Sequence, residues 1–148
     1  RRKGYEAAMA GHGLAVNEGC FWRVTPTLDG AYRDMLALLQ EGRKPPTAFF
    51  AGNDIIAVGS MRAFTEMGYR IPEDISIIGM DDVAICQFCS PPLSTIRVFR
   101  QDMGAIAVST LLELSPKLTE GCVSKTELSV ALVRRESVAA PGEAPAGK

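Results

Sequence analysis

Two short apolar runs, each ending in a pair of polar side chains, constrain the fold of this chain more than any other feature. They read TAFFAGND at residues 47–54 and ISIIGMDD at residues 75–82. The second run lacks the alternation of a half-exposed strand, so we expect a strand that is covered on both faces. The sequence between the runs has helical spacing up to about Met67. Strand, helix and strand in this order predict a parallel βαβ unit, and hence an α/β fold.

The polar pairs form the candidate ligand site. In an open parallel sheet the strands end at one edge, where helix N-termini also point. Asn53 and Asp81 each follow the end of a predicted strand, so we expect them on the rim of one crevice. An amide, a carboxylate and an arginine together suit neutral polyhydroxylated ligands such as sugars. The second residues of the pairs, Asp54 and Asp82, are better suited to capping a helix or bracing a loop.

Two other interpretations of these residues remain open. All four side chains could simply end strands and cap helices. Paired aspartates also hold Mg²⁺ in phosphoryl-transfer proteins, which would make the chain an enzyme with Asp81 and Asp82 as ligands. That chemistry also needs a lysine and a Ser or Thr at neighbouring strand ends. These strand ends offer neither clearly, and Lys44 precedes its strand.

The remaining segments give weaker signals. Further helices are expected at residues 4–10, at 31–41 and from about 102, and further strands within 19–24 and 127–136. Gly42 is expected to end the helix at 31–41. In the last of these segments, the alternating Leu128, Val130 and Leu132 predict an edge strand with one wet face.

Composition excludes several classes of protein. The net charge is −1 and the 16 basic residues are spread along the chain, so it is a poor nucleic-acid binder by itself. No apolar run approaches the roughly 18 residues that cross a bilayer. The four cysteines include a C-x-x-C pair, Cys86 and Cys89, but the single histidine, His12, is remote in sequence. We therefore expect no metal site, no cofactor, and reduced thiols in a cytoplasmic protein.

The ordered motifs ND, IPED, GMDD, PPLSTI and ALVRRES resemble those of the LacI/GalR family of bacterial transcription regulators, from residue 1 to about residue 138. The resemblance implies a type I periplasmic-binding-protein-like fold, in which two doubly wound α/β subdomains enclose a ligand cleft. It also implies an incomplete fragment without the helix-turn-helix headpiece. The chain begins at arginine, so we expect the carboxyl-terminal piece of a longer protein.

The same resemblance implies a division of the chain. Residues 1–92 would form the carboxyl-terminal subdomain, without its first strand. Residues 93–116 would be a crossover segment and a helix directed toward the amino-terminal subdomain. Residues 117–138 would return as an edge strand, and 139–148, rich in Pro, Gly and Ala, would be a disordered tail.

Roles of single residues also follow from the resemblance. Arg1 occupies the arginine of the R-x-x-G-Y motif, and Asn53 and Asp81 occupy the positions that contact the effector. The position that carries a stacking aromatic in many members falls on Pro26, with Trp22 and Phe21 nearby but out of register, so the stacking residue is left unassigned. Exposed Trp favours sugar faces, which makes Trp22 a possible ligand-stacking residue, although a Trp in such a position is more often part of the core.

The resemblance implies a homodimer or higher oligomer, and an unpaired sheet edge favours self-association as well. Met61, Ile85 and Phe88 are expected to be exposed at the dimer interface. The predicted function is that of an effector-sensing, dimerising fragment of a regulator, with no catalysis. It would bind a small molecule, such as a sugar, and control operator DNA through the absent headpiece. The alternative binding module is a periplasmic sugar receptor of a transporter.

Overall fold

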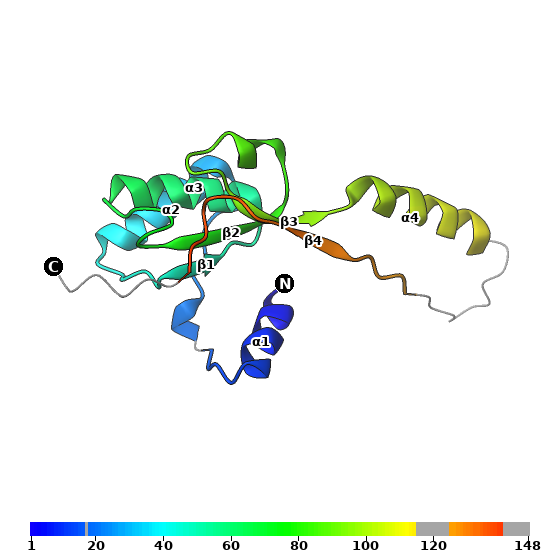
Figure 1. The fold of residues 1–148 in the computed structure, drawn as a ribbon, viewed down its shortest axis with the longest axis horizontal. Helices are drawn as coiled ribbons and strands as arrows, with labels where there is room; N and C mark the ends of the chain where they lie inside the picture. The colour runs from blue at the N-terminus through cyan, green and yellow to red at the C-terminus, as the bar shows by residue number, and fades with distance from the viewer. Residues whose placement is uncertain (17, 115–124, 141–148) are drawn as a thin grey trace.

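A computed structural model describes residues 1–16, 18–114 and 125–140. Within these ranges, four strands form one sheet in the order β1-β2-β3-β4 (Figure 1). The strands β1 (Ala48–Phe50), β2 (Ser76–Asp81) and β3 (Ser94–Val98) run parallel, and β4 (Val130–Val133) runs antiparallel to β3. The predicted parallel βαβ unit, formed by β1, the helix at Asp54–Glu66 and β2, is confirmed.

Two helices pack in succession on the sheet. Helix α3 (Asp54–Glu66) contacts β2, and α2 (Leu28–Gln40) lies along α3. Gly59 makes this close approach possible, because a Cβ atom at this position would overlap the carbonyl oxygen of Leu28. The predicted stop signal for α2 is also confirmed: Gly42 follows the helix with a φ of +84°.

The core lies between α3, α2 and the sheet. Its buried side chains come from the two predicted apolar runs and the inward faces of the helices, and include Met35, Leu39, Met61, Phe64, Ile75, Ile77 and Leu93. Ile75 and Ile77 are each 1% exposed, but they lie on the same face of the strand. The alternate residues Ser76, Ile78 and Met80 are only half-buried, so the expectation of a strand covered on both faces is wrong for this chain.

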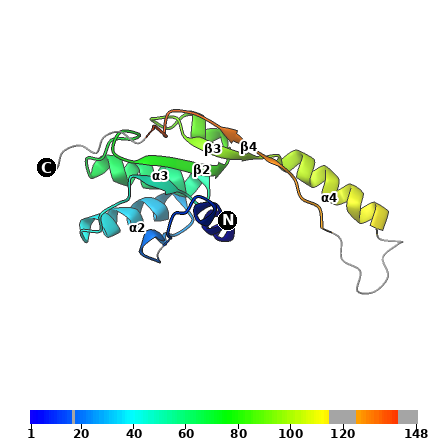
Figure 2. The same ribbon diagram turned by 60° about the horizontal axis from the view of Figure 1, so that its bottom comes forward.

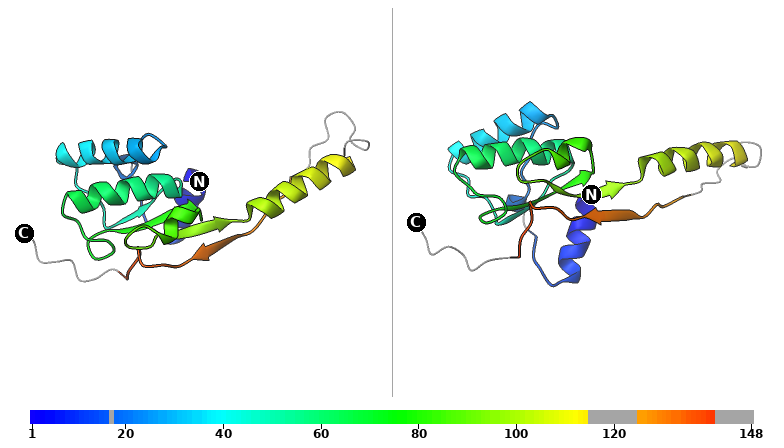
Figure 3. Two further views of the ribbon diagram at one scale, coloured as in Figure 1. Left: turned by 90° about the horizontal axis from the view of Figure 1, so that it is seen from above. Right: turned by 45° about the horizontal axis from the view of Figure 1, so that its top comes forward.

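Helix α4 (Arg100–Leu114) and β4 extend away from this core (Figures 1 and 3). Large apolar side chains on them are exposed, among them Val108, Leu111, Leu112, Val130 and Leu132. The edge position of β4 agrees with the alternating pattern, but its apolar series faces solvent and the intervening Ala131 and Val133 are half-buried. Sequence alternation shows that a strand has two different faces, but only the packing decides which face is covered.

The amino-terminal segment differs from expectation. Helix α1 (Arg2–Gly11) is present, but none of its residues is buried, and Figure 2 shows it beside one border of the sheet. The strand expected within residues 19–24 is wrong. Glu18–Cys20 form the 3₁₀ helix η1, and residues 21–24 belong to no helix or strand. A strand forms only against a neighbour, which local sequence cannot supply.

In the part of the chain that is described, no helix combines the length and apolar character needed to cross a bilayer. The expected tail lies mostly outside the described residues, which end at residue 140.

Candidate functional site

The first polar pair, which follows β1, caps helix α3 and connects it to neighbouring segments. Asn53 is the N-cap of α3, and its Oδ1 accepts a hydrogen bond from the Ile56 N–H at 2.8 Å. Asp54 is buried and accepts hydrogen bonds from the Val83 N–H at 2.9 Å and from the Thr95 hydroxyl at 2.5 Å. The carboxylate of Asp54 therefore ties the start of α3 to the loop after β2 and to β3.

The second polar pair, at the end of β2, has an unusual backbone. Asp81 has a φ of 112° and Asp82 a φ of 52°, a region that side chains other than glycine rarely adopt. Such conformations cost free energy and persist where surrounding contacts hold them, often at functional sites. The surrounding contacts therefore hold the backbone at the end of β2 in a conformation that two aspartates rarely adopt.

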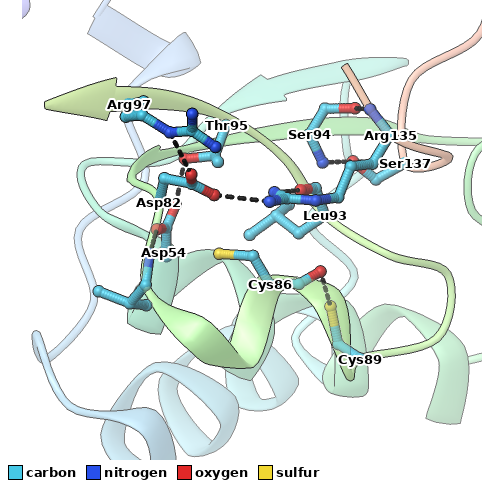
Figure 4. Close-up of polar contacts among 11 residues, drawn as sticks. Asp54, Asp82, Cys86, Cys89, Leu93, Ser94, Thr95, Arg97, Arg135 and Ser137 are labelled. Atoms are coloured by element: carbon cyan, nitrogen blue, oxygen red, sulfur yellow. Dashed lines mark hydrogen bonds and ion pairs between the residues drawn. The ribbon is translucent and has the colours of Figure 1, made fainter. Parts of the chain in front are cut away.

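Asp82 supplies the contacts that hold this turn (Figure 4). Arg97 Nε donates to its Oδ2 at 2.7 Å, and Arg135 Nη2 donates to its Oδ1 at 2.6 Å. Arg135 also donates to the Leu93 carbonyl oxygen at 2.7 Å. Burial alone would raise the pKa of Asp82, but the hydrogen bonds from Arg135 and Arg97 outweigh it and lower the pKa below its ordinary value. Asp82 thus joins β2, β3 and the segment after β4.

The predicted ligand contacts Arg1 and Asp81 lie together. Arg1 Nη2 is 3.7 Å from Asp81 Oδ1, and Arg1 Nε donates to the Met80 sulfur at 2.9 Å. Both side chains are partly accessible to solvent. Arg1 thus brings a cation from the start of α1 to the end of β2, as the family motif implies.

Asn53 lies at the same edge of the sheet. Phe50 pairs with Ile78, so the parallel register carries Asn53 to the level of Asp81. The side chain is only partly exposed, and its oxygen is already used as a helix cap. Its amide nitrogen is the group that remains to meet a ligand.

Two shallow cavities flank the pair formed by Arg1 and Asp81. One, of about 330 Å³, has Asp81, Arg97 and Arg100 in its lining. The other, of about 180 Å³, is lined by Arg1 and Gly52 with three aromatic side chains, Tyr5, Phe21 and Phe50. An ionic hollow therefore adjoins an aromatic one.

Trp22, the predicted stacking residue, does not line the cavity that contains Arg1. It packs edge-on against Phe49, with their ring centroids 5.3 Å apart, and the Arg43 guanidinium lies 4.5 Å from its ring centroid. Phe21 lines that cavity instead. Sequence reasoning placed both Phe21 and Trp22 near the stacking position but did not choose Phe21, because the turn at η1, which sets the direction of each aromatic side chain, has no clear sequence signal.

The structure gives little room for a magnesium site at the second pair. Both carboxylate oxygens of Asp82 are already paired with arginines, which would repel a divalent cation. Over the described ranges, no three His, Cys, Asp or Glu side chains are grouped as metal ligands would be.

The cysteine pair lies on and after η2 (Ala84–Gln87), behind the second polar pair. Burial, followed by a hydrogen bond with Asp54, raises the pKa of the Cys86 thiol to about 12. The Cys89 thiol donates to the carbonyl oxygens of Cys86 and Pro91, each at 3.4 Å. Both thiols are used in local packing.

The predicted dimer residues have different environments. Phe88 is 83% exposed and Ile85 is half-buried. The expectation of an exposed Met61 is wrong, because this side chain is 3% exposed and belongs to the hydrophobic core. It lies on the face of α3 that packs inward, and helical periodicity alone did not identify that face.

Comparison with known proteins confirms the predicted periplasmic-binding-protein-like fold class. A family model described as a periplasmic binding protein-like domain matches residues 1–138. The HTH-type transcriptional repressor PurR of Haemophilus influenzae is 37% identical over 140 residues, which are 93% of this chain and 41% of the repressor.

Solved structures agree. A sugar-binding transcriptional regulator of the LacI family from Escherichia coli, complexed with phosphate, aligns with a TM-score of 0.76 and 34% identity, over 93% of this chain and 49% of that chain. A LacI family regulator from Arthrobacter sp. FB24 in complex with lactose aligns with a TM-score of 0.72 and 31% identity, over 93% of this chain and 50% of that chain. The present chain spans about two fifths of the length of its curated relative.

Proposed function

The chain belongs to the periplasmic-binding-protein-like domains of LacI/GalR-type transcription regulators, and from this premise we propose that it is an effector-sensing and dimerising part of such a regulator. Its ligand is a small polar molecule, with sugars as the first class to test. The chain makes and breaks no covalent bond. Operator DNA is bound by a headpiece outside this sequence.

The observation that carries this proposal is the meeting of Arg1 with Asp81. The two residues are far apart in sequence, yet their charged groups lie 3.7 Å apart and remain partly accessible. An arginine fork and a carboxylate side by side offer donors and acceptors to adjacent hydroxyl groups of one ligand. The neighbouring aromatic hollow supplies the apolar surface that a sugar face or a planar base requires.

The choice of sugars is supported by the relatives. One neighbour is described as sugar-binding and another was solved with lactose. Nucleobases and phosphorylated sugars fit the same arginine, amide and carboxylate groups, so they form the second class of candidates.

The Asp82 contacts provide a route for allosteric response. Asp82 follows Asp81 directly and is held by Arg97 of β3 and by Arg135, which follows β4. A ligand that moves Asp81 therefore acts on the two strands that lead to and from α4. Differential affinity for two arrangements of these elements would shift their populations.

Dimerisation would use the exposed surface around η2. Phe88 projects there, and a hollow of about 410 Å³ beside it is lined by α3 residues and Cys89. Burying an aromatic side chain of this size typically contributes about 2 kcal/mol. We expect sedimentation equilibrium to show dimers at micromolar concentration and Phe88→Ser to weaken them. Val108→Ser on α4 is the control. Equal dissociation of both variants would contradict this interface.

Effector binding is tested by calorimetry on the full chain with ribose, cellobiose, lactose, adenine and uracil. Asp81→Ala should weaken binding of whichever compound binds by at least about tenfold, because a charge-assisted hydrogen bond is worth about 1.5–3 kcal/mol. Glu73→Ala, an exposed change at the opposite end of β2, should leave affinity unchanged. Unchanged affinity in Asp81→Ala would remove this residue from the site.

A further inference from the structure

The C-x-x-C pair, Cys86 and Cys89, has no role in the proposed effector site. The two residues lie on one turn: Cys86 belongs to η2, and the chain still turns at Cys89, whose N–H donates to the Ile85 carbonyl oxygen at 3.1 Å. In so tight a turn, residues three apart lie nearly above one another, with about 6 Å between their Cα atoms. That spacing lies within the range of roughly 4.4–6.8 Å that a disulfide spans. Rotation of the two side chains therefore suffices to join the thiols.

The two thiols differ in accessibility. Cys86 is 0% exposed, and its thiol forms a hydrogen bond with the buried Asp54. Cys89 is half-buried and lines the hollow of about 410 Å³ on α3. Figure 4 shows the Cys86 sulfur directed toward the side of Asp54 and Asp82, and the Cys89 sulfur next to the Cys86 carbonyl oxygen. The pair therefore consists of one thiol that solvent reaches and one that lies behind it.

We propose that Cys86 and Cys89 are a redox-responsive pair that closes to a disulfide by exchange with a low-molecular-weight disulfide such as oxidised glutathione. The Cys89 thiolate attacks one sulfur of the oxidant and expels a glutathione thiolate. Cys86 then attacks the Cys89 sulfur and expels the second glutathione thiolate, while its own proton passes to Asp54 and on to solvent. Both glutathione thiolates take up protons, so two protein thiols are oxidised to one disulfide and one oxidised glutathione is reduced to two glutathiones.

Burial makes the reduced pair the resting state. It raises the pKa of both thiols, that of Cys86 to about 12, so little of either is the reactive thiolate at neutral pH. Closure is therefore slow until the oxidant is abundant, and its rate rises with pH. Closure also turns the Cys86 sulfur away from Asp54, which removes a hydrogen-bond donor from a buried carboxylate. A disulfide formed against such a cost is readily reduced again.

Closure acts on the surface where dimerisation is proposed, so this step rests on the proposed function. Phe88 lies between the two cysteines in sequence and is 83% exposed. A bond between Cys86 and Cys89 fixes the turn that carries the Phe88 ring and draws the Cys89 sulfur out of the wall of the hollow. The dimer of the reduced chain should therefore dissociate more readily when the pair is closed.

The chemical test uses the full chain with Cys20→Ser and Cys122→Ser, so that Cys86 and Cys89 are its remaining thiols. Incubation with oxidised glutathione should remove both thiols together, lower the mass by two hydrogen atoms and leave no glutathione attached. Excess glutathione should restore both thiols. A lasting glutathione adduct, a disulfide between two chains, or two unreacted thiols would each overturn the proposal.

Two matched variants in this background test the order of the steps. Cys86→Ser should retain a stable glutathione adduct on Cys89, because no second thiol displaces it. Cys89→Ser should react at least about tenfold more slowly, because the remaining thiol is buried and meets solvent only on local unfolding. Circular dichroism verifies that both variants fold. Equal adduct formation in the two variants would overturn the assigned order.

Sedimentation equilibrium tests the effect on assembly. Closing the pair should raise the dimer dissociation constant about tenfold, the change expected when an aromatic anchor loses its fit at an interface. The control, Cys86→Ser combined with Cys89→Ser, should dimerise equally with and without oxidised glutathione. An unchanged dissociation constant in the closed chain would overturn the link to assembly. Absence of dimers in the reduced chain would contradict the proposed interface and this link together, while the thiol and mass measurements still decide the disulfide.

Discussion

The two polar pairs, Asn53-Asp54 and Asp81-Asp82, are similar in sequence but differ in backbone and partners. The first has ordinary extended geometry at Asn53 and leads directly into α3. The second has left-handed backbone at both aspartates. Asp54 bonds to a neutral hydroxyl and a backbone N–H, whereas Asp82 bonds to two arginines.

This difference indicates how one recurring sequence pattern serves two purposes. The first pair fixes the start of a helix and connects buried elements. The second pair holds Asp81 in a costly conformation that contacts Arg1 and faces a cavity. In each pair the second residue anchors the loop, which leaves the first residue available at the rim.

The largest effect is expected from Asp54→Ala. The change leaves the buried Val83 N–H and the Thr95 hydroxyl without their acceptor, so the free energy of unfolding should fall by about 3 kcal/mol. Urea denaturation measures it. The control, Asp29→Ala at an exposed helix position, should cost less than about 0.5 kcal/mol. A similar small loss in both variants would show that the first pair does not brace the core.

Gly79→Ala tests how closely β2, the strand that leads into the second pair, packs against Asp54 of the first pair. A Cβ atom on Gly79 would overlap Asp54 Oδ1 and lie 3.0 Å from a Leu93 methyl group. Asp54 cannot move without breaking its hydrogen bonds, so we expect a loss of about 2.5 kcal/mol by urea denaturation. Gly4→Ala, with nothing within 4 Å, should instead stabilise by about 0.5–1 kcal/mol. A neutral Gly79→Ala would mean that the pairs are not rigidly coupled.

Asp82→Asn should change the pH dependence of stability, which distinguishes the role of the second pair from that of the first. At pH 7 we expect a loss of about 2 kcal/mol, because two charge-assisted hydrogen bonds weaken. The pKa of Asp82 is lowered in the folded state, so its contribution is present above the unfolded value, near 3.9, and is lost as pH falls through the folded value.

The variant should therefore lose less stability than the parent on acidification below about pH 4. Thermal melts from pH 7 to pH 2.5 measure this difference. Parallel curves for the two proteins would argue that the arginines do not stabilise the charged form of Asp82.

The smallest effect is expected at Asn53. Asn53→Ala removes the cap of α3 and should cost about 1 kcal/mol in urea denaturation, whereas Asn53→Ser keeps an accepting oxygen and should cost only a few tenths. Because Asn53→Ser retains the cap but lacks the amide nitrogen, a fall in effector affinity without loss of stability would assign a ligand contact to Asn53. Unchanged affinity would leave it a cap alone.

Sequence patterns predicted the elements whose signals are local. The stop at Gly42, the cap at Asn53 and the presence of a strand before Asp82 all follow from local chemistry, and the structure has them. The strand expected within residues 19–24 is not formed, and Met61 is buried where exposure was expected. Each of these depends on a partner distant in sequence.

The sequence by itself determined the βαβ order and the division of each polar pair into a rim residue and an anchor, because caps, turns and apolar runs act over a few residues. Only the tertiary structure decided that Arg1 meets Asp81 and that Asp82 is held by Arg135, 53 residues away. Those contacts depend on the start of α1 lying beside the end of β2 and on β4 pairing with β3. Long-range packing reflects the whole core, and no local pattern specifies which charged side chains it brings together.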